Sequence, residues 1–194
     1  MSKTQYYCAA SLDGYIAEAD DSLDWLLGYE GSYEGAGAEP GPMGEGGGYE
    51  RFYDGVGALV SGATTYEFLL DHMGADGDWP YPGKPYWVLS SRELPLPEGE
   101  GVDARIARGE VAELHGEMME AAGERNLWVV GGGNVASQFA AAGLLDELLL
   151  TVVPVVLGAG KPVFDERLPG GPLQLTGTRT FESGMVELDY ELRR

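Results

Sequence analysis

The sequence predicts an α/β domain whose sheet is mostly parallel and ends in an antiparallel edge. Short apolar runs typical of buried strands alternate with segments whose apolar residues recur at helical intervals, as in chains that build parallel sheets. Near the C-terminus, residues 185–192 alternate apolar and charged side chains with a period of two. A Glu-Ser-Gly turn separates them from a second strand-like segment, which indicates a closing hairpin.

The individual elements follow from the same patterns. Residues 28–48 are rich in Gly and Pro and are expected to form a long loop. Asn134 is expected to cap the helix that follows it, and Gly143 to end that helix. We expect strands at 5–11, 58–60, 86–89, 102–106, 127–130, 148–157, 173–181 and 185–192, and helices at 49–55, 64–72, 111–119 and 135–142.

Composition excludes several classes of protein. The length of 194 residues suits one large domain or two very small ones, and a hydrophobic content of 44% is enough for a real core. A net charge of −20 argues against binding to nucleic acid or to an anionic membrane, because phosphate affinity comes chiefly from Lys and Arg. The lone Cys8 excludes a disulfide framework and a multi-cysteine zinc site, and no other metal pattern occurs. Without a signal-peptide or membrane-span pattern, a soluble cytoplasmic protein is expected.

Three consecutive glycines, Gly131 to Gly133, separate an apolar run from a helix-like segment. With Ala136 they match the Gly-x-Gly-x-x-Ala pattern that binds dinucleotide phosphates at a helix start. The alternative is a tight turn that allows close packing. A Rossmann domain is disfavoured because the motif comes late and Val152 and Val153 stand where the ribose-binding acid belongs. A glycine turn facing a phosphate is expected nevertheless.

One further segment is similar to a phosphate-binding loop, at residues 157–162. Val155 stands where its first Gly belongs, and Pro162 replaces the Ser or Thr that would bind a metal, so the motif is rejected.

A set of motifs in a characteristic order resembles the dihydrofolate reductase-like family. The branch is that of the reductase domain of the riboflavin-biosynthesis deaminase-reductase, in stand-alone form because no zinc-deaminase signature precedes it. The resemblance covers nearly the whole chain. The motifs are SLDGYIA at 11–17, GATTYE at 62–67, VLSSR at 88–92, VGGG at 130–133, GLLDE at 143–147 and VPVVLGAGKPVF at 153–164.

The resemblance implies a single domain over residues 1–194, with a mixed, mostly parallel eight-stranded sheet flanked by helices and NADPH across its strand ends. The family commonly has Arg where Ala63 stands. Three alternatives follow from its absence: Arg92 alone recognises the 2′-phosphate, selectivity is relaxed so that NADH is accepted, or cofactor binding is lost. The implied contacts are Ala10 through Ile16 with nicotinamide and ribose, Gly62, Ala63, Thr64 and Thr65 with the adenosine-side phosphates, Ser90, Ser91 and Arg92 with the 2′-phosphate, and Gly131, Gly132, Gly133, Asn134 and Val135 with the pyrophosphate.

The implied reaction is hydride transfer from nicotinamide to a small heterocycle, pyrimidine-like or pterin-like, with a carboxyl group supplying a proton. Three carboxyls are candidates. Asp13 precedes Gly14 and is more typical of a turn, Asp24 can cap a helical turn, and Glu30 follows a tryptophan as in folate enzymes, without their prolines. The alternative function is a non-catalytic nucleotide-binding or interaction protein that kept the fold, which Ala63 favours and the glycine turn opposes.

The resemblance also implies a homodimer, and the apolar Trp128 and residues 148–157 provide surface that can be buried between subunits. We predict that light scattering at micromolar concentration gives twice the 20.7 kDa of one chain. A mass equal to one chain would contradict the prediction.

Overall fold

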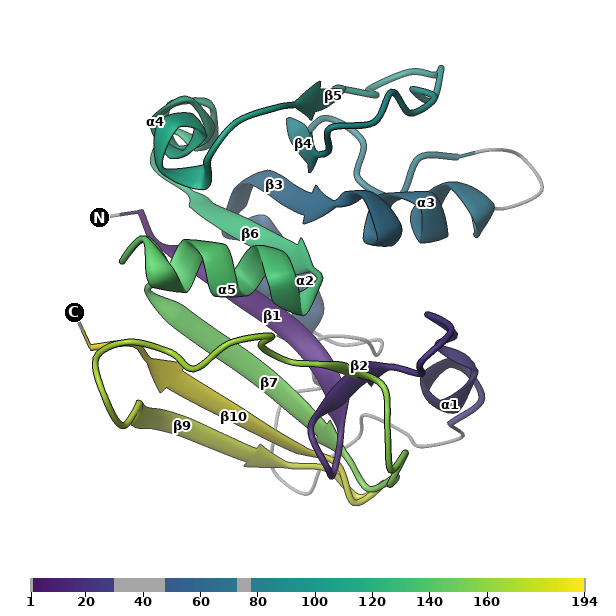
Figure 1. Cartoon of the computed structure of the whole chain (residues 1–194), viewed down its shortest axis with the longest axis vertical. Helices are drawn as coiled ribbons and strands as arrows, with labels where there is room; N and C mark the ends of the chain where they lie inside the picture. Colours follow the sequence, from purple (N-terminus) through teal and green to yellow (C-terminus); the bar gives the residue numbers. More distant parts are fainter. Residues whose placement is uncertain (1, 30–47, 73–77, 194) are drawn as a thin grey trace.

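The computed structural model describes residues 2–29, 48–72 and 78–193. The protein has a central sheet with helices on both faces (Figure 1). The sheet strands are β1 (Thr4–Ser11), β3 (Val56–Gly62), β4 (Tyr86–Leu89), β5 (Ala104–Ala107), β6 (Asn126–Gly131), β7 (Glu147–Val153), β9 (Gln174–Thr180) and β10 (Val186–Glu191). The helices are α1 (Asp24–Leu27), α2 (Gly48–Asp54), α3 (Ala63–Asp71), α4 (Val111–Ala122) and α5 (Gly133–Ala141). A separate two-stranded sheet joins β2 (Tyr15–Ala17) to β8 (Lys161–Pro162).

The strand order confirms the predicted fold class. The eight strands lie in the order β5-β4-β3-β6-β1-β7-β10-β9. Neighbours from β5 through β7 are parallel, whereas β10 is antiparallel to both β7 and β9. The sheet is thus mixed and mostly parallel, and the C-terminal hairpin forms its edge. None of the helices in the described part of the chain is long and apolar enough to cross a membrane.

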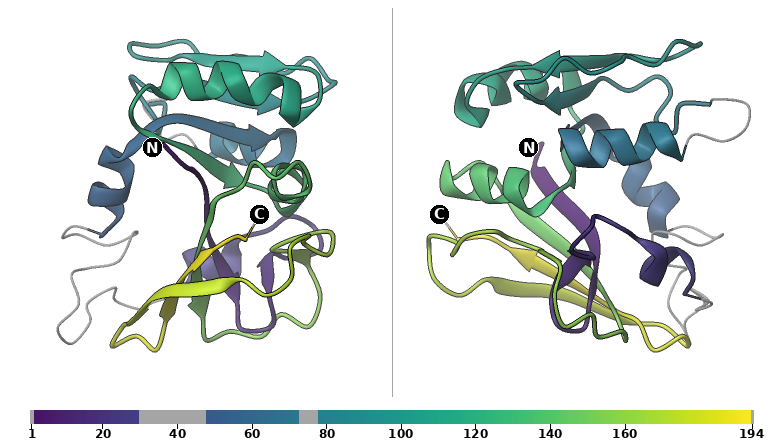
Figure 2. Two further views of the ribbon diagram at one scale, coloured as in Figure 1. Left: turned by 90° about the vertical axis from the view of Figure 1, so that its left-hand side faces the viewer. Right: turned by 45° about the vertical axis from the view of Figure 1, so that its right-hand side comes forward.

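Alternating side chains along the strands build two cores, one on each face of the sheet. Tyr6 and Val129 pack toward α4 and α5, whereas their neighbours Tyr7 and Trp128 pack with Tyr86 in an aromatic cluster on the α2 face. Figure 2 shows α5 and α2 on opposite sides of the strands. Burial on both faces explains why these strands are apolar throughout in sequence.

Two predicted boundaries were wrong. Asn134 does not cap α5: the helix begins at Gly133 with Gly132 as its N-cap, and the Asn134 side chain accepts a hydrogen bond from Gln138 within the helix. The strand expected at 148–157 ends at Val153, because a proline follows and the chain turns into a loop. Within it only Leu148, Thr151 and Val153 are buried. Gly143, with a φ of +69°, follows the C-cap of α5 as predicted.

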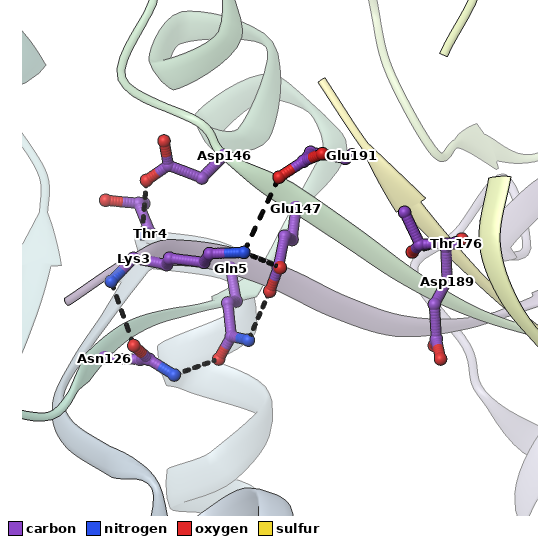
Figure 3. Close-up of polar contacts among 9 residues, drawn as sticks. All are labelled: Lys3, Thr4, Gln5, Asn126, Asp146, Glu147, Thr176, Asp189 and Glu191. Carbon is purple, nitrogen blue, oxygen red and sulfur yellow. Dashed lines mark hydrogen bonds and ion pairs between the residues drawn. The ribbon is translucent and has the colours of Figure 1, made fainter. Parts of the chain in front are cut away.

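A polar network fixes β1 between its neighbours at the amino ends of the strands (Figure 3). The Gln5 amide donates to Glu147 on β7 at 2.7 Å and accepts from Asn126 on β6 at 3.0 Å. The backbone N–H of Lys3 donates to the Asn126 side chain at 2.9 Å, and the Lys3 ammonium pairs with Glu147 and, at 3.7 Å, with Glu191 on β10. The base of the sheet is therefore tied together across four strands.

Part of the apolar surface behind the dimer prediction is used inside the subunit. Trp128 is only 6% exposed within the aromatic cluster, and Leu148 is 4% exposed in the core beneath α5. β7 also lies between two other strands. The homodimer remains a prediction, and among the residues expected at its interface Val156, after the end of β7, is 67% exposed and accessible to a partner.

Two glycines provide a matched test of packing. A Cβ added at Gly57 on β3 would lie 2.2 Å from the Ala122 carbonyl oxygen at the end of α4, whereas one at the exposed Gly116 of α4 meets nothing within 4 Å. We predict that Gly57→Ala lowers the free energy of unfolding by about 1–3 kcal/mol through overpacking. Gly116→Ala should raise it by up to about 1 kcal/mol through helix propensity. Urea denaturation measures both, and equal effects would contradict the close approach of β3 to α4.

Candidate functional site

The central feature of the site is a parting of two adjacent strands. β1 pairs with β6 only from Thr4 to Tyr6, whose partner is Val129, but it pairs with β7 as far as Ser11. On its other side β6 slips by one residue against β3, so that Val130 is an extra residue of a bulge. Such bulges bend a strand and are frequent beside active sites. The sheet therefore opens between β1 and β6 toward the carboxyl ends of the strands.

A cavity of about 520 Å³ occupies this opening. Cys8 and Ala9 of β1 line it on one side, and Val130 and Gly131 of β6 on the other. The first residues of α3 and α5 and parts of the small β2–β8 sheet complete its wall. Its volume is in the range of small-molecule and cofactor sites, and its place at the carboxyl ends of parallel strands is where open α/β sheets bind ligands.

Both helices that begin at the cavity are suited to bind an anion. α3 and α5 are nine residues long, and their N-cap residues, Gly62 and Gly132, are glycines that make no side-chain cap hydrogen bond. The first N–H groups of an α-helix have no partner within the helix and carry its positive dipole end. A phosphate in the cavity can therefore be held by backbone N–H groups alone.

The three glycines of the turn have different reasons to be glycine. A Cβ at Gly133 would lie 2.3 Å from the Pro162 carbonyl oxygen, and one at Gly131 would lie 3.0 Å from the Thr65 hydroxyl oxygen. At Gly132 the nearest atom would be 3.9 Å away, and the residue lines the cavity. The peptide bond between Gly131 and Gly132 is cis. Close packing thus explains Gly133 and Gly131, and Gly132 is the glycine that leaves space for a ligand.

The structure brings most of the predicted cofactor residues together at this cavity. Ala10 is 1% exposed and does not line it, and its place is taken by Ala9. Ser90, Ser91 and Arg92 follow Leu89, which does line it, but are themselves outside the wall. The predicted residues that line the cavity are Ile16, Gly62, Ala63, Thr64, Thr65, Gly131, Gly132, Gly133, Asn134 and Val135.

The Arg92 side chain forms an ion pair with Glu67 of the neighbouring helix α3. Its guanidinium donates to both carboxylate oxygens of Glu67 on α3, at 3.0 and 2.7 Å, and this pairing raises the pKa of Arg92. Both side chains are about half exposed, so the pair contributes little to stability. A phosphate at this end of the cavity would have to compete with Glu67 for the guanidinium.

The proposed proton donors differ in position. The Asp13 carboxylate accepts hydrogen bonds from the Ser11 hydroxyl and from the backbone N–H groups of Leu157 and Gly158, which lower its pKa. Asp13 therefore fastens two loops together, as expected of a turn residue, and does not line the cavity. Asp24 is the exposed first residue of α1. Glu30 lies outside the described residues.

The cavity also contains polar side chains that the sequence patterns did not single out. Tyr6 is fully buried, and its hydroxyl has no hydrogen-bond partner among the described residues. Burial raises the pKa of Tyr6 well above its ordinary value and that of Cys8 to about 12, so both side chains are neutral at physiological pH. Asp21, Gln138, Lys161 and Asp165 are the other polar residues of the wall that were missed. Lys161 lies in the 157–162 segment whose phosphate-binding similarity was rejected.

The described residues contain no group of three or more His, Cys, Asp or Glu side chains able to hold a metal ion.

The architecture is that of the dihydrofolate reductase-like fold, as comparison with solved structures shows. A dihydrofolate reductase from Enterococcus faecalis, solved with NADP(H) and RAB-propyl, has the same fold, with a TM-score of 0.58 at 19% identity over 97% of this chain and 94% of its own. A crystal structure of a Shewanella sp. PV-4 protein with a provisional riboflavin-biosynthesis name has a TM-score of 0.77 at 27% identity over 99% of both chains.

Sequence comparison shows the family. The model of the RibD C-terminal domain matches residues 83–187, more than half of the chain. The uncharacterized protein YwjB of Bacillus subtilis (strain 168) is 33% identical over 97% of both chains. The protein therefore belongs to the RibD C-terminal domain family, which confirms the resemblance found in its sequence.

The position of Arg92 allows a prediction about cofactor preference. Replacing Arg92 by Ala should weaken NADPH binding by about tenfold or more, because hydrogen bonds to charged groups contribute about 1.5–3 kcal/mol, while NADH, without the 2′-phosphate, should hardly respond. Restoring the arginine of the family by Ala63→Arg should strengthen NADPH binding selectively. Fluorescence titration measures both cofactors. Arg108, which pairs loosely with Glu93 at 3.8 Å, provides the matched Arg→Ala control. Equal losses for NADPH and NADH would show that Arg92 is structural.

Proposed function

We propose that the protein is an NAD(P)H-dependent reductase, with NADPH preferred, that transfers hydride to a small heterocyclic substrate of the pyrimidine or pterin type. The observation that supports this most is the cavity itself. It extends from two uncapped helix starts, suited to phosphates, into the opening of the sheet between β1 and β6. A ligand with phosphates in its middle and a flat ring at one end fits that arrangement.

The backbone supplies most of the proposed contacts. N–H groups at the start of α5, with open space above Gly132, would hold the pyrophosphate, and those at the start of α3 would hold the adenosine side. In the opening, the ladder between β1 and β6 has ended, so their facing edges can offer N–H and C=O groups to a ring.

When bound, the cofactor supplies the hydride, and the protein has to align the two rings and exclude water. The opening in the sheet confines a flat ring between strand edges, which restricts its orientation. Asp13 is committed to its loop contact. Asp24 lies between Leu23 and Leu26, two residues that line the cavity, and is the better placed of the two described candidates for proton supply.

A second candidate function is nucleotide binding without catalysis. Ala63 stands at the position where the family commonly has arginine, and the Arg92 guanidinium is paired with Glu67. A cavity with no free cation for the 2′-phosphate would favour nucleotides that lack it. Consumption of NADPH in the presence of folates or aminopyrimidines separates the two functions, because only a reductase oxidises the cofactor.

The proposal predicts the effect of a branched side chain at Gly132. In Gly132→Val the side chain would fill the space above the start of α5, so we expect dinucleotide binding to be lost while the fold is kept. Fluorescence titration with NADPH and NADH, together with circular dichroism, measures both properties. Gly116→Val, at an exposed glycine with no atom within 4 Å, is the matched control and should bind normally. Unchanged binding by folded Gly132→Val would move the cofactor elsewhere, and a wild-type protein that binds neither dinucleotide would overturn the proposal.

A further inference from the structure

Charge in the cavity is concentrated on a few side chains. Among the described lining residues, the charged ones are Asp21, Lys161 and Asp165, and Lys161 is the single cation. The protein as a whole has a net charge of −20. Without Lys161, the charged side chains in the described cavity wall would all be negative. A phosphate would then be repelled both by these side chains and by the net negative charge of the protein.

Lys161 sits beside the start of α5. It is the first residue of β8, and the next carbonyl, that of Pro162, approaches Gly133 so closely that a Cβ there would lie 2.3 Å from it. β8 also pairs with β2, with Lys161 opposite Ala17. The lysine is thus carried by a small sheet that rests on the glycine turn, at the helix start where backbone N–H groups are available.

Within the described part of the chain, the ammonium of Lys161 forms a weak ion pair with Asp21. Its Nζ lies 3.4 Å from the Asp21 Oδ1, and both side chains are nearly half exposed, at 46% and 45%. Ion pairs of this exposure contribute about 0–1 kcal/mol. A lysine side chain is long and flexible, so the ammonium can change partner at small cost.

Asp21, in contrast, is held in position. It has a φ of +70°, in the left-handed region that Asp tolerates. Its turn is closed by two backbone hydrogen bonds, from Asp21 to Glu18 at 3.1 Å and from Glu18 to Ser22 at 3.0 Å. The backbone that carries the Asp21 carboxylate is therefore held at the edge of the cavity.

We propose that Lys161 is the cation that binds the pyrophosphate of the dinucleotide, and that Asp21 competes with this phosphate for it. The inference rests on the proposed function. When the ligand enters, the Lys161 ammonium leaves Asp21 and joins the N–H groups of α5. Because Lys161 lies beside the start of α5, we assign it to the pyrophosphate, which NADPH and NADH share. Arg92, in contrast, follows Leu89 and pairs with α3 at the other end of the cavity.

The test compares three variants with the wild type by titration with NADPH, NADH and inorganic pyrophosphate. Lys161→Met keeps the length of the side chain without its charge and should weaken all three ligands by about tenfold, to the same extent for both dinucleotides. Lys161→Arg should bind much as the wild type does. Asp21→Asn frees the lysine and should strengthen binding, by up to about fivefold from the weakness of an exposed pair.

The decisive result is that Asp21→Asn and Lys161→Met are expected to change the binding affinity in opposite directions. If the pair only fastened β2 to β8, both Lys161→Met and Asp21→Asn would weaken binding and lower the melting temperature together, and the proposal would be overturned. Unchanged binding by Lys161→Met, or a loss for NADPH alone, would also overturn it. If the wild-type protein bound pyrophosphate through Lys161 but neither dinucleotide, the proposed reductase function would be refuted and the phosphate site at Lys161 would stand. If it bound none of the three ligands, the proposed function and the phosphate site would both be refuted.

Discussion

The parting of β1 from β6 is the constraint on which the site depends. At the amino ends of the strands β1 is tied to both neighbours, through Gln5 to Asn126 and Glu147. Beyond Tyr6 it stays paired with β7 alone, while the bulge at Val130 bends β6 away. A sheet that is fixed at its base and open at the carboxyl ends of its strands leaves a cavity inside an otherwise close-packed domain. The backbone edges of β1 and β6 border this cavity on either side.

The wall of the opening is completed by a second close approach. Because Gly133 has no side chain, β8 can rest on the start of α5, and the small β2–β8 sheet then lies along the cavity. In a protein with a net charge of −20, anion binding here has to come from local geometry. Among the described residues, two helix starts and Lys161 are the positive groups in the wall of the cavity, and Arg92 lies just outside it.

Local sequence patterns were enough for most of the elements and for the antiparallel hairpin at the edge of the sheet. They failed where a boundary depends on more than residue type. Asn134 has the side chain of an N-cap, but the glycine turn already has the backbone geometry to start the helix two residues earlier. The apolar residues after Pro154 look like a strand, but Leu157 and Gly158 bind the Asp13 carboxylate in a loop.

The cavity was predictable only in part. The glycine turn and the 62–65 segment have sequence signatures because backbone approach and helix starts demand particular residues. Cys8 and Tyr6 line the opening only because the ladder between β1 and β6 stops at one register, which no local pattern encodes. The contact between Asp21 and Lys161 likewise joins two turns that are distant in the chain.

Amide hydrogen exchange with and without NADPH tests the central claim most directly, because it reports on the strand edges themselves. If the ligand enters the opening, the amides of residues 8–10 and 130–133 should exchange more slowly when NADPH is bound, while those at the base of β1, residues 4–6, should change little. Bound NADPH that leaves residues 8–10 and 130–133 unprotected, or protects only the β9–β10 edge, would contradict this account of the site.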